Sequence, residues 1–349
     1  MPSFHPRRQA ARRLVLTALL VVPLLVVGLD LCLDRLLPHW EDPERAVLLS
    51  RLRDRVAEQP HRPLRLVLGS SRATNAFDGR WLSESDPHGP LVVNVSLVGS
   101  SPFTSLLTLR RVVAEGYRPR SLVLEVLPSY LQNPLITPQG QPPELHRLRL
   151  ADWPLLYRLH PEHSLGLTWY MAEARTARCL RHRAELMARI WPRLAPPDRV
   201  RFRAHQEASI DSHGWHSFRM DPVPTEIAKR GFEVARTVYE PALREMRPPS
   251  PVFARVMKEL FAFCHEQKIT VEAVLFMPES SAFRGFYGPG VESGLSEIVS
   301  SVCEQHGVRF LDARDWCPDD VFIDGHHLTA RGSRLFLERL RREQDRSRN

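Results

Sequence analysis

The sequence predicts an α/β fold: a three-layer αβα domain with an open parallel sheet between two layers of helices. Short, almost wholly apolar runs are typical of parallel strands buried on both faces. Longer runs with helical periodicity alternate with them, as in α/β folds. The expected strands are Leu64–Leu68, Leu91–Leu97, Ser121–Leu127, Thr270–Phe276 and Val308–Leu311. The expected helices are Thr104–Glu115, Val252–Gln267, Glu292–Gln305 and Ala330–Glu343.

Residues 131–250 break this alternation. They are rich in Pro, Trp, His and Arg, with helical patterns near Ser164–Ile190 and Thr225–Glu245. We interpret them as a helical insertion that packs over one end of the sheet; a separate subdomain is the alternative. The α/β domain would then span residues 64–340, followed by a charged tail at 341–349.

Composition narrows the class of protein. The chain has 349 residues and a net charge of +8, and almost all of its positively charged side chains are arginines. The arginines are spread along the chain, and neither zinc-finger spacing nor a basic-aromatic strand pattern is present, so we do not expect nucleic-acid binding. The five cysteines show no metal-ligand spacing, and we expect no metal or cofactor. Cys264 and Cys303 lie in apolar helical stretches and are expected to be buried free thiols.

The N-terminal segment predicts a membrane anchor. Arg7, Arg8, Arg12 and Arg13 precede an uncharged stretch from Leu14 to Leu29, and apolar character continues to Leu37. A helix that spans a bilayer needs about 20 mostly apolar residues. We expect a cytoplasmic tail at 1–13, a transmembrane helix at 14–37 and a linker at 38–63. The chain would be a single-pass membrane protein with its α/β domain outside the cytoplasm; a cleaved signal peptide is the alternative.

The stretch "VLGSSR" places two hydroxyls at the end of the first expected strand. Ligands of open α/β sheets bind beyond the carboxyl ends of the strands, where Gly69, Ser70 and Ser71 would lie. A serine directly after a glycine turn can present its hydroxyl to that crevice. A serine that only caps the next helix explains the motif equally well.

A second stretch, "FIDGHHLTARGSRLFLERL", supplies an acid and a base. Asp324 and His327 are three residues apart, just before the last expected helix. At that spacing the aspartate can hold the imidazole Nδ1 while Nε2 faces a serine hydroxyl, which is the arrangement of a Ser-His-Asp triad. The alternative is a surface loop with solvated histidines.

Together these stretches resemble the SGNH (GDSL-like) hydrolase superfamily, whose fold is flavodoxin-like. The nucleophile motif Gly-Asp-Ser is similar to Gly69-Ser70-Ser71, and the closing Asp-x-x-His is similar to Asp324-Gly-His-His327. The resemblance implies a catalytic triad of Ser71, Asp324 and His327 and an oxyanion hole formed by the amides of Ser71 and Gly99. The asparagine of the family's Gly-x-Asn-Asp block is missing, and Pro128 and Ser129 stand near its place.

A membrane-anchored subset of that superfamily shares "GSSR", "N-x-S-x-x-G" and "DGHHL" and resembles accessory proteins of alginate O-acetylation and teichoic-acid D-alanylation. The stretch "MPESSAFRGFY" also resembles a loop of that subset. The resemblance implies possible substrate contacts from Ser129, Arg284 and Tyr287. It further implies an acylated cell-envelope polysaccharide or another acyl donor as substrate, and a membrane-bound O-acyltransferase as partner.

Two functions remain open from the sequence. In one, Ser71 forms an acyl ester that water or a sugar hydroxyl resolves, so that the protein is an esterase or an O-acyltransferase. In the other, the domain is a non-catalytic scaffold that binds an envelope polymer or a membrane-bound O-acyltransferase. The stretch "DSHGWHSFR" leaves a similar choice, because Trp215 is either part of a sugar-binding wall or a buried anchor of a turn.

Overall fold

The computed structural model describes residues 5–36, 42–131, 147–161, 166–169, 187, 191, 193–194, 208–216, 220–245 and 249–346. The chain divides into two compact units. Unit 1 comprises Met1–Pro43 and Glu144–Ala204, and unit 2 comprises Glu44–Pro143 and His205–Asn349. The helix predicted over 164–190 lies largely outside the described residues, as does much of the predicted insertion.

Unit 1 is helical where it is described. Helix α1 (His5–Leu36) covers most of the predicted anchor, and a 3₁₀ turn (Leu150–Asp152) leads into α7 (Trp153–Leu159). None of the helices in the described part of the chain combines the length and the apolar character that a membrane crossing requires. The predicted transmembrane helix at 14–37 therefore has no support from the structure.

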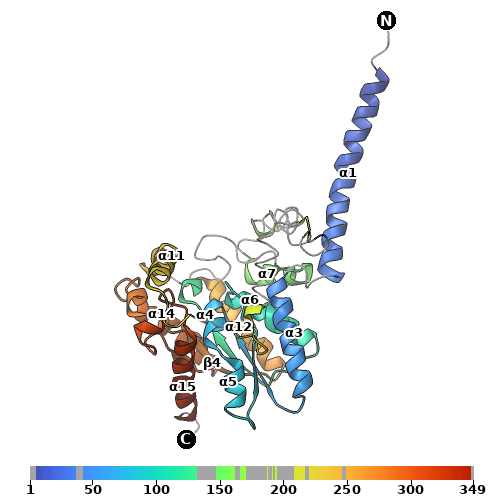
Figure 1. The fold of residues 1–349 in the computed structure, drawn as a ribbon. Helices are drawn as coiled ribbons and strands as arrows, with labels where there is room; N and C mark the ends of the chain where they lie inside the picture. Colours follow the sequence, from blue (N-terminus) through green and yellow to red (C-terminus); the bar gives the residue numbers. More distant parts are fainter. Residues whose placement is uncertain are drawn as a thin grey trace. The chain divides into compact units, whose positions relative to one another are not determined.

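Unit 2 contains a five-stranded parallel sheet with the strand order β2-β1-β3-β4-β5 (Figure 1). This order is that of the flavodoxin-like α/β folds, in which ligands bind near the switch point between β1 and β3. The predicted α/β parallel architecture is confirmed. The strands are β1 (Leu64–Leu68), β2 (Leu91–Asn94), β3 (Ser121–Glu125), β4 (Thr270–Phe276) and β5 (Phe310–Asp312).

Strand β2 ends earlier than the sequence predicts, although its contact with β1 continues. The Asn94 side chain accepts a hydrogen bond from the Ser96 N–H (3.1 Å) and turns the backbone out of regular strand geometry. Val95 and Leu97 nevertheless donate to the carbonyls of Val67 and Gly69, each at 3.0 Å. The segment after β2 is thereby held beside the turn that carries Ser71.

The helices of unit 2 are α3 (Pro43–Glu58), α4 (Ser71–Ala76), α5 (Gly79–Glu84), α6 (Pro102–Ala114), α11 (Thr225–Leu243), α12 (Pro251–Glu266), α13 (Ser281–Arg284), α14 (Val291–Glu304) and α15 (Ala330–Arg346). The helices predicted near 104–115, 225–245, 252–267, 292–305 and 330–343 are present among them, together with four helices that were not predicted, α3, α4, α5 and α13. The segment 38–63, expected as a linker, instead contains α3. That helix buries Leu48 and Leu52, which gives its sequence an apolar face to order.

Alternate side chains of the strands enter two apolar layers. On one face, Val67, Val123 and Leu275 pack in a core cluster with Phe77 after α4 and Phe336 of α15. Residues of the opposite parity, such as Leu66 and Leu124, are also fully buried. Burial on both faces is the property that wholly apolar strands predict. The predicted free thiols Cys264 and Cys303 are confirmed, and burial raises the pKa of each to about 12.

A hairpin at residues 210–216 clamps α4. Ile210 bridges His216, and the Asp211 carboxylate accepts hydrogen bonds from the His213 and Trp215 amides. The Trp215 indole N–H donates to the Asn75 carbonyl at 2.7 Å, and the His216 N–H donates to the Thr74 carbonyl at 3.0 Å. These bonds tie the hairpin to the helix that follows Ser70, so Trp215 serves as an anchor of the turn.

We predict that Trp215→Ala lowers the free energy of unfolding by about 2 kcal/mol, because it removes a half-buried ring and a hydrogen bond. Val234→Ala, at an apolar position of the same unit that is 59% exposed, should change it by less than about 0.5 kcal/mol. Chemical denaturation of the purified variants measures both. Unchanged stability with weakened carbohydrate binding in Trp215→Ala would instead support the sugar-binding wall.

Candidate functional site

Ser71 lies at the start of α4, directly beyond the carboxyl end of β1. Gly69 has to be glycine here, because a Cβ at this position would clash with Glu125 and lie 2.8 Å from the Ala73 Cβ. The turn brings Ser71 to the first helical position, where a backbone N–H has no partner within the helix. The Ser71 side chain is half-exposed.

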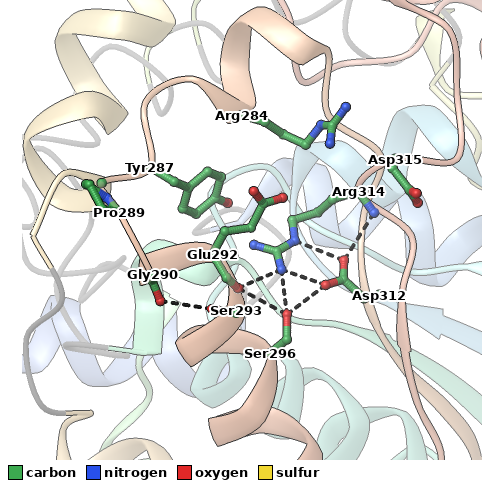
Figure 2. A pocket seen from close by; sticks show the side chains of 11 residues that line it. Arg284, Tyr287, Pro289, Gly290, Glu292, Ser293, Ser296, Asp312, Arg314 and Asp315 are labelled. Atoms are coloured by element: carbon green, nitrogen blue, oxygen red, sulfur yellow. Dashed lines mark hydrogen bonds and ion pairs between the residues drawn. The ribbon is translucent and has the colours of Figure 1, made fainter.

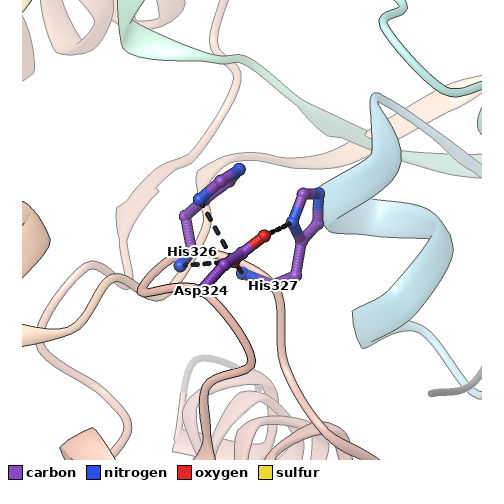
Figure 3. A group of neighbouring side chains, drawn as sticks. All are labelled: Asp324, His326 and His327. Carbon is purple, nitrogen blue, oxygen red and sulfur yellow. Dashed lines mark hydrogen bonds and ion pairs between the residues drawn. The ribbon is translucent and has the colours of Figure 1, made fainter. Parts of the chain in front are cut away.

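The base and the acid come from a tight loop before α15. Ile323 donates its amide to the His327 carbonyl (2.9 Å), Phe322 bridges Leu328, and Gly325 adopts a left-handed conformation with φ +91°. The Asp324 Oδ1 atom accepts the amides of His326 (3.2 Å) and His327 (2.9 Å) (Figure 3). The backbone of the loop therefore fixes the carboxylate that faces the imidazole.

The three predicted triad residues meet in one hydrogen-bonded relay. His327 Nδ1 lies 2.7 Å from Asp324 Oδ2, and His327 Nε2 lies 2.8 Å from Ser71 Oγ. Burial opposes ionisation of Asp324, but the charge of His327 and the hydrogen bond from its ring hold the pKa of this carboxyl below its usual value. An ionised aspartate fixes the proton of His327 on Nδ1 and leaves Nε2 free to accept the serine proton.

Gly99 lies on the loop held beside the Ser71 turn. The Leu97 amide donates to the Gly69 carbonyl at 3.0 Å, and the Tyr130 hydroxyl donates to the Gly99 carbonyl at 2.7 Å. Gly99 itself has φ +74°, a conformation that favours glycine. Within the described residues, neither the Ser71 amide nor the Gly99 amide donates a hydrogen bond to the protein. Both amides are therefore without a protein acceptor in the described part of the chain.

Ser70 has a different environment from Ser71. Its hydroxyl accepts the Arg72 amide (3.2 Å) as the N-cap of α4 and donates to Glu125 Oε1 at 2.8 Å. Its own amide donates to the other oxygen of Glu125. Burial at the end of β3 raises the pKa of Glu125. Ser70 therefore anchors the turn, while only Ser71 reaches the imidazole.

The three further residues expected to bind substrate are not brought into this relay. Ser129 lies in a 3₁₀ turn (Pro128–Leu131), is 8% exposed, and its buried hydroxyl has no hydrogen-bond partner among the described residues. Arg284 and Tyr287 instead line a pocket of about 670 Å³ beside the N-terminus of α14 (Figure 2).

Arg314 forms the floor of that pocket. Its guanidinium donates to Asp312 Oδ1 (2.9 Å) and to the Glu292 carbonyl (2.9 Å), and it stacks on the Tyr287 ring at 5.2 Å (Figure 2). Glu292, Asp312 and Asp315 offset the charges of Arg284 and Arg314. The pocket is polar and close to electrically balanced.

Asp324, His326 and His327 have the side-chain types of a metal site, since one carboxylate and two imidazoles lie within 4.8 Å of one another (Figure 3). Both oxygens of Asp324 already accept N–H donors, and both ring nitrogens of His327 lie at hydrogen-bond distance from protein oxygens. Within the described part of the chain this arrangement fits a proton relay better than a metal centre.

Sequence reasoning missed the side chains that surround the relay. Arg72 pairs with Glu279, and Tyr239 of α11 packs its ring against His326. The motifs around Ser71 and His327 identify the reacting groups, but Glu279 and Tyr239 lie far from them in the chain. In the sequence, the only sign of the Arg72–Glu279 contact was the acidic residue Glu279 itself, in the stretch "MPESS" directly after an expected strand.

The sequence matches no model of a known protein family, and no curated protein is significantly similar to it. Its function must therefore be inferred from the geometry and chemistry of the site.

We predict that acidification destabilises the protein through His326. Burial, together with the charge of His327, holds the pKa of His326 well below its usual value, so the folded state keeps it neutral. The unfolded chain binds that proton near pH 6.5, so this residue alone should lower stability by about 2 kcal/mol from pH 7 to pH 5, against an opposite contribution from the buried Glu125, whose pKa is raised. Urea titrations at several pH values measure this slope.

The matched controls are glutamine variants. His326→Gln should flatten the slope, whereas His61→Gln, at an exposed position, should leave it unchanged. His213, whose pKa burial lowers to about 4, adds a contribution of the same sign to every variant. An identical slope in wild type and His326→Gln would contradict a neutral buried His326.

Proposed function

We propose that this protein is a serine ester hydrolase or O-acyltransferase in which Ser71 forms a covalent acyl intermediate. One observation carries the proposal: Ser71, His327 and Asp324 form a relay with separations of 2.8 Å and 2.7 Å. A serine hydroxyl is a weak nucleophile until a neighbouring base takes its proton, and a third group has to orient that base. The relay contains each of these parts.

The proposed reaction proceeds in two steps. His327 Nε2 takes the Ser71 proton as Oγ attacks the ester carbonyl, and Asp324 stabilises the imidazolium that forms. The Ser71 and Gly99 amides donate to the tetrahedral oxyanion, and loss of one such donor typically costs about 10²- to 10³-fold in rate. His327 protonates the leaving alcohol. In the second step His327 takes a proton from water or another hydroxyl as that oxygen attacks the acyl-Ser71 carbonyl, the bond between the acyl carbon and Ser71 Oγ breaks, and His327 returns the proton to Ser71 Oγ.

The finer family assignment is part of the proposal. The flavodoxin-like strand order, the "GSSR" turn after β1 and the "DGHHL" loop before α15 support membership of the SGNH superfamily. In the SGNH superfamily the asparagine after β3 is the third donor to the oxyanion. This chain lacks that asparagine, so the proposed oxyanion hole has only the two backbone donors, the amides of Ser71 and Gly99. Tyr130 of the 3₁₀ turn that occupies this position fixes the Gly99 loop through its hydroxyl.

The substrate proposed is an acyl ester of a cell-envelope polysaccharide, with a membrane-bound O-acyltransferase as a possible partner. The support is the resemblance of "GSSR", "MPESSAFRGFY" and "DGHHL" to the membrane-anchored subset. A non-catalytic scaffold is the competing outcome. It predicts a folded protein whose Ser71 does not react.

We predict that an activated ester or a fluorophosphonate modifies wild-type protein once, at Ser71. Ser71→Ala should abolish the adduct. Ser70→Ala, the matched control, should lose about 1 to 2 kcal/mol of stability with its hydrogen bonds to Glu125 and still form the adduct. Intact-protein mass spectrometry reads both results. An adduct that survives Ser71→Ala and disappears in Ser70→Ala would reverse the assignment, and an inert, folded wild type would favour the scaffold.

We also propose that the N-terminal segment anchors the protein and that unit 2 lies outside the cytoplasm. The support is in the sequence: arginines precede Leu14, and the stretch from Leu14 to Leu29 carries no charge. We predict that protease added to intact spheroplasts removes unit 2. Protection until the cells are permeabilised would contradict this orientation.

A further inference from the structure

The residue that follows the proposed nucleophile belongs to a buried ion pair. Arg72 follows Ser71 in α4, and its Nη1 atom donates to Glu279 Oε1 at 2.6 Å. The Arg72 and Glu279 side chains are 3% and 0% exposed. Glu279 also accepts the Tyr287 hydroxyl at 3.1 Å. A charge pair so deeply buried fixes the direction in which each side chain points, because either charge alone would be costly in this environment.

Two aromatic rings connect this pair to the base. The Arg72 guanidinium lies 4.9 Å from the Phe283 ring centroid and 5.6 Å from that of Tyr239. The same two rings pack against His326, at 5.1 Å and 5.0 Å. His326 in turn stacks on His327 at 4.0 Å. A continuous layer of side chains therefore runs from the residue after the nucleophile to the residue before the base.

The backbone of the 277–287 loop is hydrogen-bonded to the segment after β5 and to the loop that carries Asp324 and His327. The Glu279 amide donates to the Arg314 carbonyl at 2.9 Å, and the Ser280 amide donates to the Gly325 carbonyl at 2.8 Å. Gly325 follows Asp324, so neighbouring residues of one loop hold α4 through a side chain and the acid-base loop through the main chain. Gly325 has φ +91°, a conformation that favours glycine, and a Cβ there would lie 3.1 Å from the Ser280 hydroxyl.

We propose that Glu279 is a positioning residue, which through Arg72 holds Ser71 in register with His327. This inference rests on the proposed function of Ser71. Glu279 does not touch the reacting atoms. Its carboxylate fixes the position of α4 relative to the 322–329 loop, and these are the two segments that carry the triad residues.

The energetics of buried ion pairs favour a positioning role for Glu279 over a purely stabilising one. Buried ion pairs can often be replaced by apolar residues of similar volume with little or no loss of stability. What an apolar pair cannot supply is the fixed direction of a hydrogen bond with a 2.6 Å separation. The Ser71–His327 hydrogen bond depends on the relative placement of two segments that are more than 250 residues apart, and displacement of such groups by about 1 Å can cost roughly 100-fold in rate.

The test variant is Glu279→Gln, which keeps the shape of the side chain and removes its charge. Steady-state hydrolysis of an activated ester gives kcat and KM, and proton NMR follows the downfield resonance of the His327 Nδ1 proton. We expect kcat to fall roughly 10- to 100-fold with KM within about twofold, and the resonance to shift or broaden. Glu279→Asp, which retains the charge, should recover part of kcat.

Asp319→Asn is the matched control. Asp319 is an exposed carboxylate that accepts the Ser281 amide at 2.6 Å, so it holds the same loop without contacting Arg72. It should leave kcat and the resonance unchanged. If Glu279→Gln does not fold, Phe283→Leu, which thins the layer between Arg72 and His326, should show the same loss of kcat at constant KM.

The outcomes separate the two proposals. Wild-type kcat and an unshifted resonance in Glu279→Gln would overturn the positioning role while the proposed function stands, and so would an equal loss in Asp319→Asn. An inert wild type would overturn the proposed function. The resonance would then still report whether Glu279 holds His327 in place.

Discussion

The hydrogen bond between the Ser71 hydroxyl and His327 Nε2 is the contact on which the proposed reaction depends. It joins the first turn after β1 to the loop before α15, and its separation of 2.8 Å leaves little tolerance for movement of either segment. Each nearby feature limits such movement. Gly69 permits the turn, Ser70 holds it to Glu125, and the Asp324 carboxylate holds the loop through backbone amides.

The flavodoxin-like sheet explains why these segments meet. Parallel strands deliver all of their carboxyl ends to one edge, so residues that follow β1, β2 and β4 are neighbours there however far apart they are in the chain. Ser71, Gly99 and Glu279 come from three such connections, and only the last loop brings in Asp324 and His327. The same edge also buries acids, Glu125 and Glu279, which are hydrogen-bonded to Ser70, Arg72 and Tyr287. Buried, hydrogen-bonded carboxyl groups therefore hold the turn that carries Ser71.

Local patterns predicted the parts of this arrangement that depend on near neighbours. The apolar runs identified all five strands because burial on both faces favours apolar residues, and the Asp-x-x-His spacing identified the Asp324–His327 pair, which one loop builds. The Arg72–Glu279 contact spans 207 positions in the sequence and leaves no periodic trace. Arg284 and Tyr287, predicted to contact substrate, line a pocket beside α14, which leaves that prediction untested, while the Glu279 side chain in the same stretch is fully buried. A loop sequence does not encode which of its side chains faces the interior, because packing from α11 and α4 decides that.

The most direct test of the account is a crystal structure of the protein after reaction with a fluorophosphonate. We predict a phosphonyl group bonded to Ser71 Oγ, with one phosphonyl oxygen accepting hydrogen bonds from the amides of both Ser71 and Gly99, and with His327 still paired with Asp324. A phosphonyl group on another residue, or an oxygen that points away from both amides, would contradict it.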